Sequence, residues 1–268
     1  AAERPDLARR FLNAYLEFTG DYGGLRTLAY FLVYRAMVRA KVGLMRARQL
    51  GPRDQARAAA QESCRRYLDL AKHCASRGPG FIVLTHGFSG SGKTTLSQSL
   101  VELSGAIRIR SDVERKRMHG GPIAGRPQPD VAGGLYSVDV TDSTYQRLLD
   151  LSSSVLDSGH GVIVDATFVK RRHRDLFHAL AASVRVPFSI VDFTVPANTL
   201  RERILARLQQ GQDASDADLG VLEHQLATQE PLQADELAFV FSYDASRPAD
   251  DAQQSRSWAA LLRRLAPD

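Results

Sequence analysis

The residues best suited to chemistry lie in the run FIVLTHGFSGSGKTTL, residues 81–96. Gly87, Gly92, Lys93 and Thr94 fill every fixed place of the pattern GxxxxGK(S/T). In that pattern the glycines let backbone N–H groups turn toward phosphate oxygens, the lysine reaches the β- and γ-phosphates, and the hydroxyl is placed to hold Mg²⁺. The sequence therefore predicts a nucleoside triphosphate site.

The surroundings of this run favour a phosphate-binding loop over a merely flexible Gly/Ser segment. An apolar, strand-like run precedes it and an amphipathic, helix-like run follows, so the positive amino end of a helix points at the ligand. The residues predicted to bind the nucleotide are Gly87, Ser89, Gly90, Ser91, Gly92, Lys93, Thr94 and Thr95.

A carboxylate and an arginine follow the second strand-like run, in IRIRSDVERKR, residues 107–117. Asp112 lies beyond the strand end, and Arg115 shares its helix face one turn later. The carboxylate can accept the proton of an attacking hydroxyl, and the guanidinium can hold a phosphoryl group or the acceptor. Ser111 or Asp112 as a simple helix cap is the alternative. Proximity to the phosphate loop favours catalysis.

The third strand-like run, VIVDATF at residues 162–168, ends in Asp165. A carboxylate at such a strand tip orients Mg²⁺, so Thr94 and Asp165 are the predicted metal ligands. The alternative is that Asp165 caps the following turn. The basic cluster at residues 170–174 is more typical of an exposed helix face than of a substrate clamp.

A later helix, residues 197–209, carries Arg203 and Arg207 four residues apart and therefore on one face. Such a pair suits a lid that closes over the phosphates and neutralises transition-state charge. An exposed helix with Glu202 as a local partner is the alternative. A long Gly/Pro-rich loop at 119–137 is expected beside the acceptor.

Together GFSGSGKTT, RSDVERKR, VIVDATF and LRERILARL resemble predicted P-loop kinases of an AAA-like ATP-binding group that are fused behind an aminoglycoside-phosphotransferase-like domain. More distantly they are similar to polynucleotide, gluconate and zeta-toxin kinases and to chloramphenicol phosphotransferases. The resemblance covers about residues 80–245 and implies ATP and Mg²⁺ as cofactors. It also implies the catalytic residues Lys93, Asp112, Arg115, Arg203 and Arg207.

The chain is expected to have two parts, residues 1–77 and 78–268, with the boundary at Arg-Gly-Pro-Gly, residues 77–80. Residues 1–77 read as helices only, and they resemble the last helices of the phosphotransferase-like partner domain. The resemblance thus implies such a domain upstream in the full-length protein. The catalytic segment of that domain is absent here, so no phosphotransfer chemistry is expected of residues 1–77.

After residue 80 strands alternate with helices, which predicts an α/β fold with a parallel sheet. The expected architecture is a three-layer P-loop NTPase sandwich of the nucleoside-monophosphate-kinase kind, preceded by an all-α segment. Strands are expected at residues 81–85, 106–109, 162–164, 188–193 and 237–241.

Composition adds a location and limits the partners. The formal net charge is +5, and residues 1–80 hold 15 Lys or Arg against 7 Asp or Glu. This excess is more typical of a solvated or docking helix face than of a nucleic-acid or membrane surface. Cys64 and Cys74 lie ten residues apart in one expected helix, too far to bond, and no leader-like segment begins the chain. We expect a cytoplasmic protein with no membrane contact.

The function predicted from these residues is transfer of the γ-phosphoryl group of Mg-ATP to a hydroxyl of a small-molecule acceptor that the sequence does not identify. Two alternatives remain. One is a polynucleotide or RNA 5′-hydroxyl kinase, which would bind oligonucleotides in a salt-sensitive way. The other is a nucleotide-gated binding module that phosphorylates no acceptor.

Overall fold

The structure is a computed structural model that describes residues 4–52, 54–76, 78, 80–120, 138–210, 219–246 and 255–265, without the side chains of 138, 207–210 and 255–257. The chain forms two compact units, Ala1–Gly20 with Pro79–Asp268, and Asp21–Gly78. The predicted division at residue 77 placed all the early helices together. The structure instead groups the first twenty residues with the sheet-containing unit.

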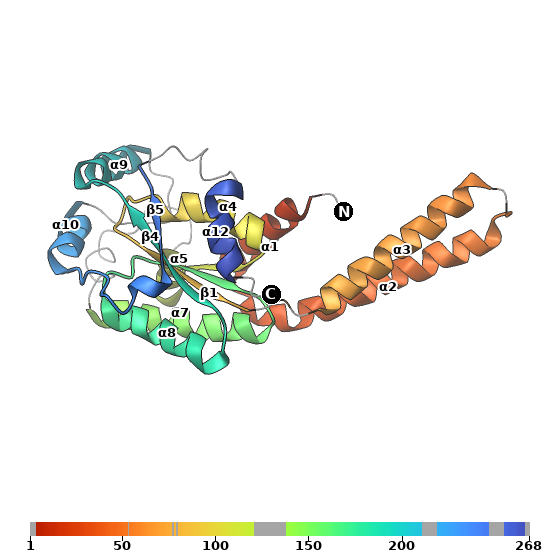
Figure 1. Cartoon of the computed structure of the whole chain (residues 1–268), viewed down its shortest axis with the longest axis horizontal. Helices are drawn as coiled ribbons and strands as arrows, with labels where there is room; N and C mark the ends of the chain where they lie inside the picture. Colours follow the sequence, from red (N-terminus) through yellow and green to blue (C-terminus); the bar gives the residue numbers. More distant parts are fainter. Residues whose placement is uncertain are drawn as a thin grey trace. The chain divides into compact units, whose positions relative to one another are not determined.

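A five-stranded parallel sheet forms the centre of the larger unit (Figure 1). The strands are β1 (Ile82–His86), β2 (Ile107–Arg110), β3 (Val162–Asp165), β4 (Phe188–Thr194) and β5 (Val240–Asp244), in the order β2-β3-β1-β4-β5. Apolar runs form the central strands β1 and β3 because a parallel sheet is covered on both faces. This topology confirms the predicted P-loop fold, in which ligands bind beyond the carboxyl ends of the strands.

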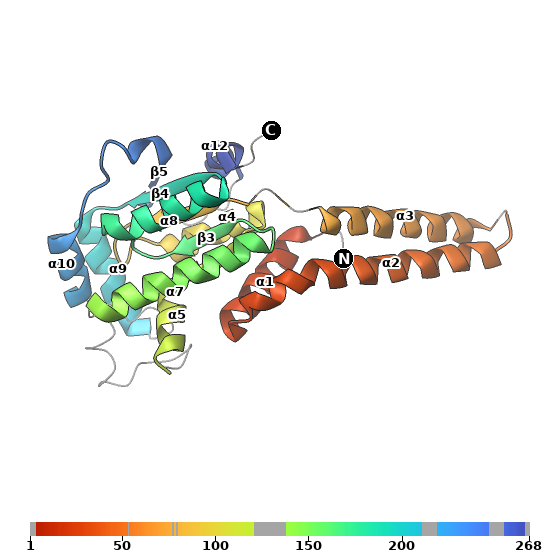
Figure 2. The same ribbon diagram turned by 90° about the horizontal axis from the view of Figure 1, so that it is seen from below.

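Helices cover both faces of the sheet (Figure 2). One layer contains α4 and α12, with α1 packed beside α4 and β2, and the other contains α7 and α8. A buried cluster that includes Val83, Leu100, Ile163 and Trp258 fills the space between the sheet and the first layer. The helix bounds are α1 (Pro5–Thr19), α4 (Lys93–Ser104), α5 (Ser111–Met118), α7 (Val138–Asp157), α8 (Arg171–Val184), α9 (Ala197–Gln210), α10 (Leu219–Thr228) and α12 (Ser255–Leu265).

Helix α1 is tied to strand β2 by a side-chain amide. Asn13 is 6% exposed; its Nδ2 donates to Ala106 O at 3.1 Å and its Oδ1 accepts from Arg108 N at 2.7 Å. Arg9 of the same helix donates to the carbonyls of Glu102 and Leu103 at the end of α4. These bonds explain why α1 belongs to the same unit as the sheet.

The smaller unit contains a short 3₁₀ turn, Tyr22–Gly24, and a hairpin of two long helices, α2 (Leu25–Gln49) and α3 (Gln55–Ala75) (Figure 1). Small residues let the helices approach: a Cβ on Gly43 would lie 3.3 Å from Ala60 O. Larger apolar side chains of α2 are exposed, among them Tyr30, Phe31 and Tyr34. Cys64 and Cys74 are free, as predicted. Among the described helices none is long and apolar enough to cross a membrane.

The last strand begins three residues later than predicted because of a buried ion pair. Arg174 of α8 is 1% exposed and bonds Glu236 twice, with Nε to Oε1 at 2.6 Å and Nη2 to Oε2 at 2.9 Å. Glu236 also accepts from the backbone N–H of Gln233, and Leu237–Phe239 then form a 3₁₀ turn. The sequence predicted an exposed helix face for the basic cluster at residues 170–174. That prediction is wrong for Arg174, which is buried.

Removing the cation of this pair should destabilise the protein. We expect Arg174→Met to lower the free energy of unfolding by about 3 kcal/mol, because the Glu236 carboxylate would stay buried without its partner. Arg172→Met is the control, since Arg172 pairs with Asp142 at the surface. Urea unfolding of both variants measures the difference, and equal stability of the two would contradict the prediction.

The pair should also make stability depend on pH. Burial raises the pKa of Glu236, but the bonds from Arg174 and Gln233 outweigh it and the pKa is lowered. This stabilisation is therefore present above the unfolded-state pKa of a glutamate and is lost as the pH falls through the lower folded-state value.

Candidate nucleotide and acceptor site

The loop after β1 has the backbone of a phosphate cradle. Gly87, Gly90 and Gly92 have positive φ angles of 141°, 83° and 83°. A Cβ on Gly87 would lie 3.0 Å from both Phe193 O and Ser91 Oγ, so only glycine fits there. No side chain caps the amino end of α4, within the residues described, and Thr94 and Thr95 lie in its first turn. The N–H groups of this end suit phosphate oxygens.

Lys93 lies inside this loop and is 9% exposed. Its Nζ donates to Gly87 O at 3.0 Å and to Phe88 O at 2.7 Å, and it lies 3.4 Å from Ser91 Oγ. The ammonium group is thus held on the loop that the sequence predicted to bind phosphates.

The two predicted metal ligands lie together. Thr94 Oγ1 donates to Asp165 Oδ2 at 2.7 Å, and Asp165 is 4% exposed at the last position of β3. The described residues contain no group of three or more His, Cys, Asp or Glu side chains that could hold a metal ion. One hydroxyl and one carboxylate are the oxygen donors that Mg²⁺ uses when phosphates and water complete its shell. The residues therefore fit a Mg²⁺-nucleotide complex.

Asp112 and Arg115 form a pair at the start of α5. Arg115 Nη1 donates to Asp112 Oδ1 at 3.1 Å, and the side chains are 10% and 27% exposed for Arg115 and Asp112. The cap position of α5 is Arg110, with no side-chain cap bond. The capping alternative for Asp112 therefore does not hold in this structure.

Tyr145 of α7, which was not predicted from the sequence, lies near enough to this pair for the charges of Asp112 and Arg115 to act on its hydroxyl. Its hydroxyl accepts from Phe168 N at 3.1 Å and lies 3.5 Å from Thr167 Oγ1. Burial raises the pKa of the Tyr145 hydroxyl. Thr167 O in turn accepts from Gly87 N at 3.1 Å, so the segment after β3 is joined to the phosphate loop.

Helix α9 packs directly against the phosphate loop. A Cβ on Gly90 would lie 3.1 Å from Leu200 O, and a Cβ on Gly92 would lie 3.8 Å from Arg203 Nη1. Arg203 Nη2 donates to Ala245 O at 3.0 Å. The structure thus places Arg203 beside the loop. The side chain of Arg207 lies outside the described residues, as does most of the predicted acceptor loop at 119–137.

Helix α10 contributes a second unpredicted contact to the loop. Gln225 Oε1 accepts from Ser89 N at 3.0 Å, and Gln225 Nε2 donates to Ser89 Oγ at 3.1 Å. The two residues are 136 positions apart in the chain, so no local pattern could have indicated the pair.

Arg110, the last residue of β2, lies between carboxylates that the sequence analysis did not connect. It pairs with Asp165 in the sheet register and bonds Glu17 of α1. Burial lowers the pKa of Arg110, but the carboxylates of Asp165, Glu17 and Asp112 outweigh it and hold the pKa above its usual value. The edge of the sheet therefore alternates positive and negative groups around Asp165.

Solved structures with the same fold include kinases. A sugar kinase from Janibacter sp. has a TM-score of 0.52 at 21% identity, covering 70% of this chain and 97% of that one. Kti12 from Chaetomium thermophilum, in complex with ADP-AlF3, has a TM-score of 0.55 at 16% identity, covering 69% of this chain and 100% of the other. A putative kinase from Chloroflexus aurantiacus has a TM-score of 0.51 at 18% identity, covering 72% and 100%. At these identities the likeness shows the fold.

Curated relatives are longer than this chain. Uncharacterized proteins of Mycobacterium tuberculosis and Mycobacterium bovis are each 34% identical over 215 residues, which is 79% of this chain and 41% of theirs. The chain thus spans about two fifths of the length of these relatives.

The family model described as AAA domain matches residues 82–232. This range contains the phosphate loop, Asp112, Asp165 and Arg203, and it makes up more than half of the chain. The chain belongs to this family of P-loop nucleotide-binding AAA domains.

Proposed function

We propose that the protein is a Mg²⁺-dependent phosphotransferase that moves the γ-phosphoryl group of ATP to a hydroxyl of a small acceptor molecule. The observation that best supports this is the position of the Asp112–Arg115 pair. It follows β2 directly, and Arg110 of β2 is in register with Asp165, the partner of Thr94. A base and an anion-binding group thus stand beside the nucleotide loop, which a simple nucleotide switch would not need.

Each residue has a role in this reaction. Lys93 and the loop amides hold the β- and γ-phosphates, and Thr94 with Asp165 hold Mg²⁺, which neutralises charge on the phosphate oxygens when bound. Asp112 accepts the proton that the acceptor hydroxyl releases as its oxygen bonds to the γ-phosphorus and the bond to the ADP oxygen breaks. Arg115 orients the acceptor.

The lid arginines complete the assignment. Arg203 lies beside Gly92, where it can neutralise charge on the phosphoryl group during transfer, and we assign Arg207 to the same function from its spacing on α9. Closure over the loop excludes water, which would otherwise compete with the acceptor for the phosphoryl group. In the longer relatives we infer a further domain upstream, as the sequence predicted. Residues 78–268 of this chain form the proposed kinase domain.

An acceptor screen tests this function. The protein, Mg²⁺ and γ-labelled ATP are incubated with sugars, nucleosides, amino alcohols and oligonucleotides with 5′-hydroxyl ends, and labelled acceptor and ADP release are measured. We expect a small molecule to raise ADP release at least about tenfold over hydrolysis. Labelling of oligonucleotides alone would replace the proposal with a polynucleotide kinase. Nucleotide binding with no labelled acceptor would favour a nucleotide-gated module.

A further inference from the structure

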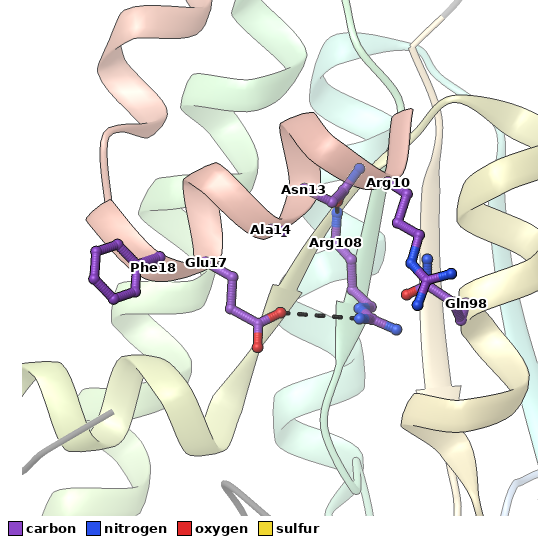
Figure 3. Close-up of a pocket in the computed structure, with 7 residues that line it drawn as sticks. All are labelled: Arg10, Asn13, Ala14, Glu17, Phe18, Gln98 and Arg108. Carbon is purple, nitrogen blue, oxygen red and sulfur yellow. Dashed lines mark hydrogen bonds and ion pairs between the residues drawn. The ribbon is translucent and has the colours of Figure 1, made fainter. Parts of the chain in front are cut away.

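Glu17 belongs to α1, which packs beside α4 and β2, and it contacts two arginines of β2. Its Oε1 accepts from Arg110 Nη1 at 2.7 Å, and its Oε2 lies 3.9 Å from Arg108 Nη2. Figure 3 shows Glu17 and Arg108 turned toward each other in a pocket of about 230 Å³, which Gln98 of α4 also lines. One carboxylate thus holds two cations.

Arg110 lies near Asp165, the carboxylate of the proposed metal site. Arg110 Nε lies 3.9 Å from Asp165 Oδ2, the same oxygen that accepts from Thr94 Oγ1. Arg110 is 13% exposed, so its guanidinium is largely removed from water and its position depends on its carboxylate neighbours. Because Glu17 bonds the same guanidinium at 2.7 Å, it partly neutralises the positive charge that Asp165 experiences.

Arg108 contacts Thr94, the hydroxyl residue of the proposed metal site. Arg108, 8% exposed, donates from Nη1 to the backbone carbonyl of Thr94 at 2.8 Å and lies 3.4 Å from Ser97 Oγ. The two arginines that Glu17 contacts therefore reach the residues assigned to Mg²⁺. Arg110 lies near the side chain of Asp165, and Arg108 bonds the backbone of Thr94.

We propose that Glu17 is a positioning residue of the Mg²⁺ site: it holds Arg110 and Arg108 so that Asp165 stays available to the cation and Thr94 stays in place. This inference rests on the proposed Mg²⁺-nucleotide site and extends it to a helix outside the matched family domain, residues 82–232. Without the Glu17 carboxylate, Arg110 would interact more strongly with Asp165 and compete with Mg²⁺ for its charge.

The test measures how much Mg²⁺ the protein needs to bind nucleotide tightly. A fluorescent ATP analogue is titrated at a series of Mg²⁺ concentrations, and the Mg²⁺ midpoint of the gain in affinity is compared between variants. We expect Glu17→Gln to raise the midpoint about tenfold, as for partners that orient metal ligands, while affinity without Mg²⁺ stays unchanged. Excess Mg²⁺ should restore the wild-type affinity.

Three further variants separate positioning from folding. Asp6→Asn removes a carboxylate from the same helix, where Asp6 pairs with Arg4 at the surface, and should leave the midpoint unchanged. In an Arg110→Met background Glu17→Gln should lose most of its effect, because the competing guanidinium is gone. If Glu17→Gln does not fold, Glu17→Asp should give an intermediate shift, since its carboxylate is one methylene shorter.

The outcomes distinguish this inference from the function on which it rests. An unchanged Mg²⁺ midpoint in a folded Glu17 variant would overturn the role of Glu17 but leave the proposed function standing. An equal loss of nucleotide affinity with and without Mg²⁺ would do the same. If the wild-type protein did not bind the ATP analogue at all, the proposed function itself would fall.

Discussion

Lys93→Ala should abolish tight triphosphate binding. Lys93 is the ammonium group held inside the phosphate loop, 2.7 Å from Phe88 O, and its charge is directed at the β- and γ-phosphates of the proposed ligand. Losing one partner of a desolvated charge pair costs about 2–5 kcal/mol, which is about 30-fold or more in affinity. Equilibrium titration with a non-hydrolysable ATP analogue measures the change.

A lysine outside the site provides the control. Lys72→Ala alters the charge equally at an exposed position of α3 and should bind the analogue as the wild type does. Circular dichroism shows whether the Lys93 variant keeps its fold, since Lys93 also bonds the loop carbonyls. Wild-type affinity and turnover in a folded Lys93→Ala protein would remove the nucleotide site as assigned.

Asp112→Asn should separate binding from chemistry. An amide at this position keeps the size of the side chain and can still contact Arg115, but it cannot accept a proton from the acceptor hydroxyl. We expect nucleotide affinity to stay within about twofold and phosphoryl transfer to fall by about 10²-fold or more, as for loss of a general base. Single-turnover transfer from labelled ATP to the acceptor found by screening gives the rate.

A second carboxylate variant distinguishes a specific effect at Asp112 from a general effect of losing one negative charge. Asp139→Asn, at the exposed start of α7, is the matched control. If Asp112→Asn weakens nucleotide binding but leaves the transfer rate per bound complex intact, Asp112 belongs to the binding site and not to catalysis.

The sequence predicted those parts of the site that local pattern encodes. Glycine spacing defined the loop around Lys93, and a carboxylate after an apolar run identified Asp165, because parallel strands bring their carboxyl ends to one edge. The fold followed from the same alternation, and strands β1 to β4 each begin and end within one residue of the predicted ranges.

The rest depended on contacts between distant residues. Glu17 lies 93 positions from Arg110 and reads as a polar residue of an amphipathic helix, so its sequence context indicates exposure rather than a role. The Gln225–Ser89 pair likewise joins residues that are far apart in the sequence, so no local pattern predicts it. Arg174 stands among five basic residues and reads as solvated, whereas its burial depends on Glu236, 62 positions later.

The amide of Asn13 has a consequence for self-association. Strand β2 is the outer strand of the sheet, and an open edge strand offers its unpaired N–H and C=O groups to any other chain. Asn13 bonds the N–H of Arg108 in β2 and the C=O of Ala106, the residue just before β2, as a peptide group of a neighbouring strand would. A copy made without its first twenty residues would expose this edge. Helix α1, with Asn13 bonded to the strand, thus covers an edge at which the sheets of two copies could otherwise pair.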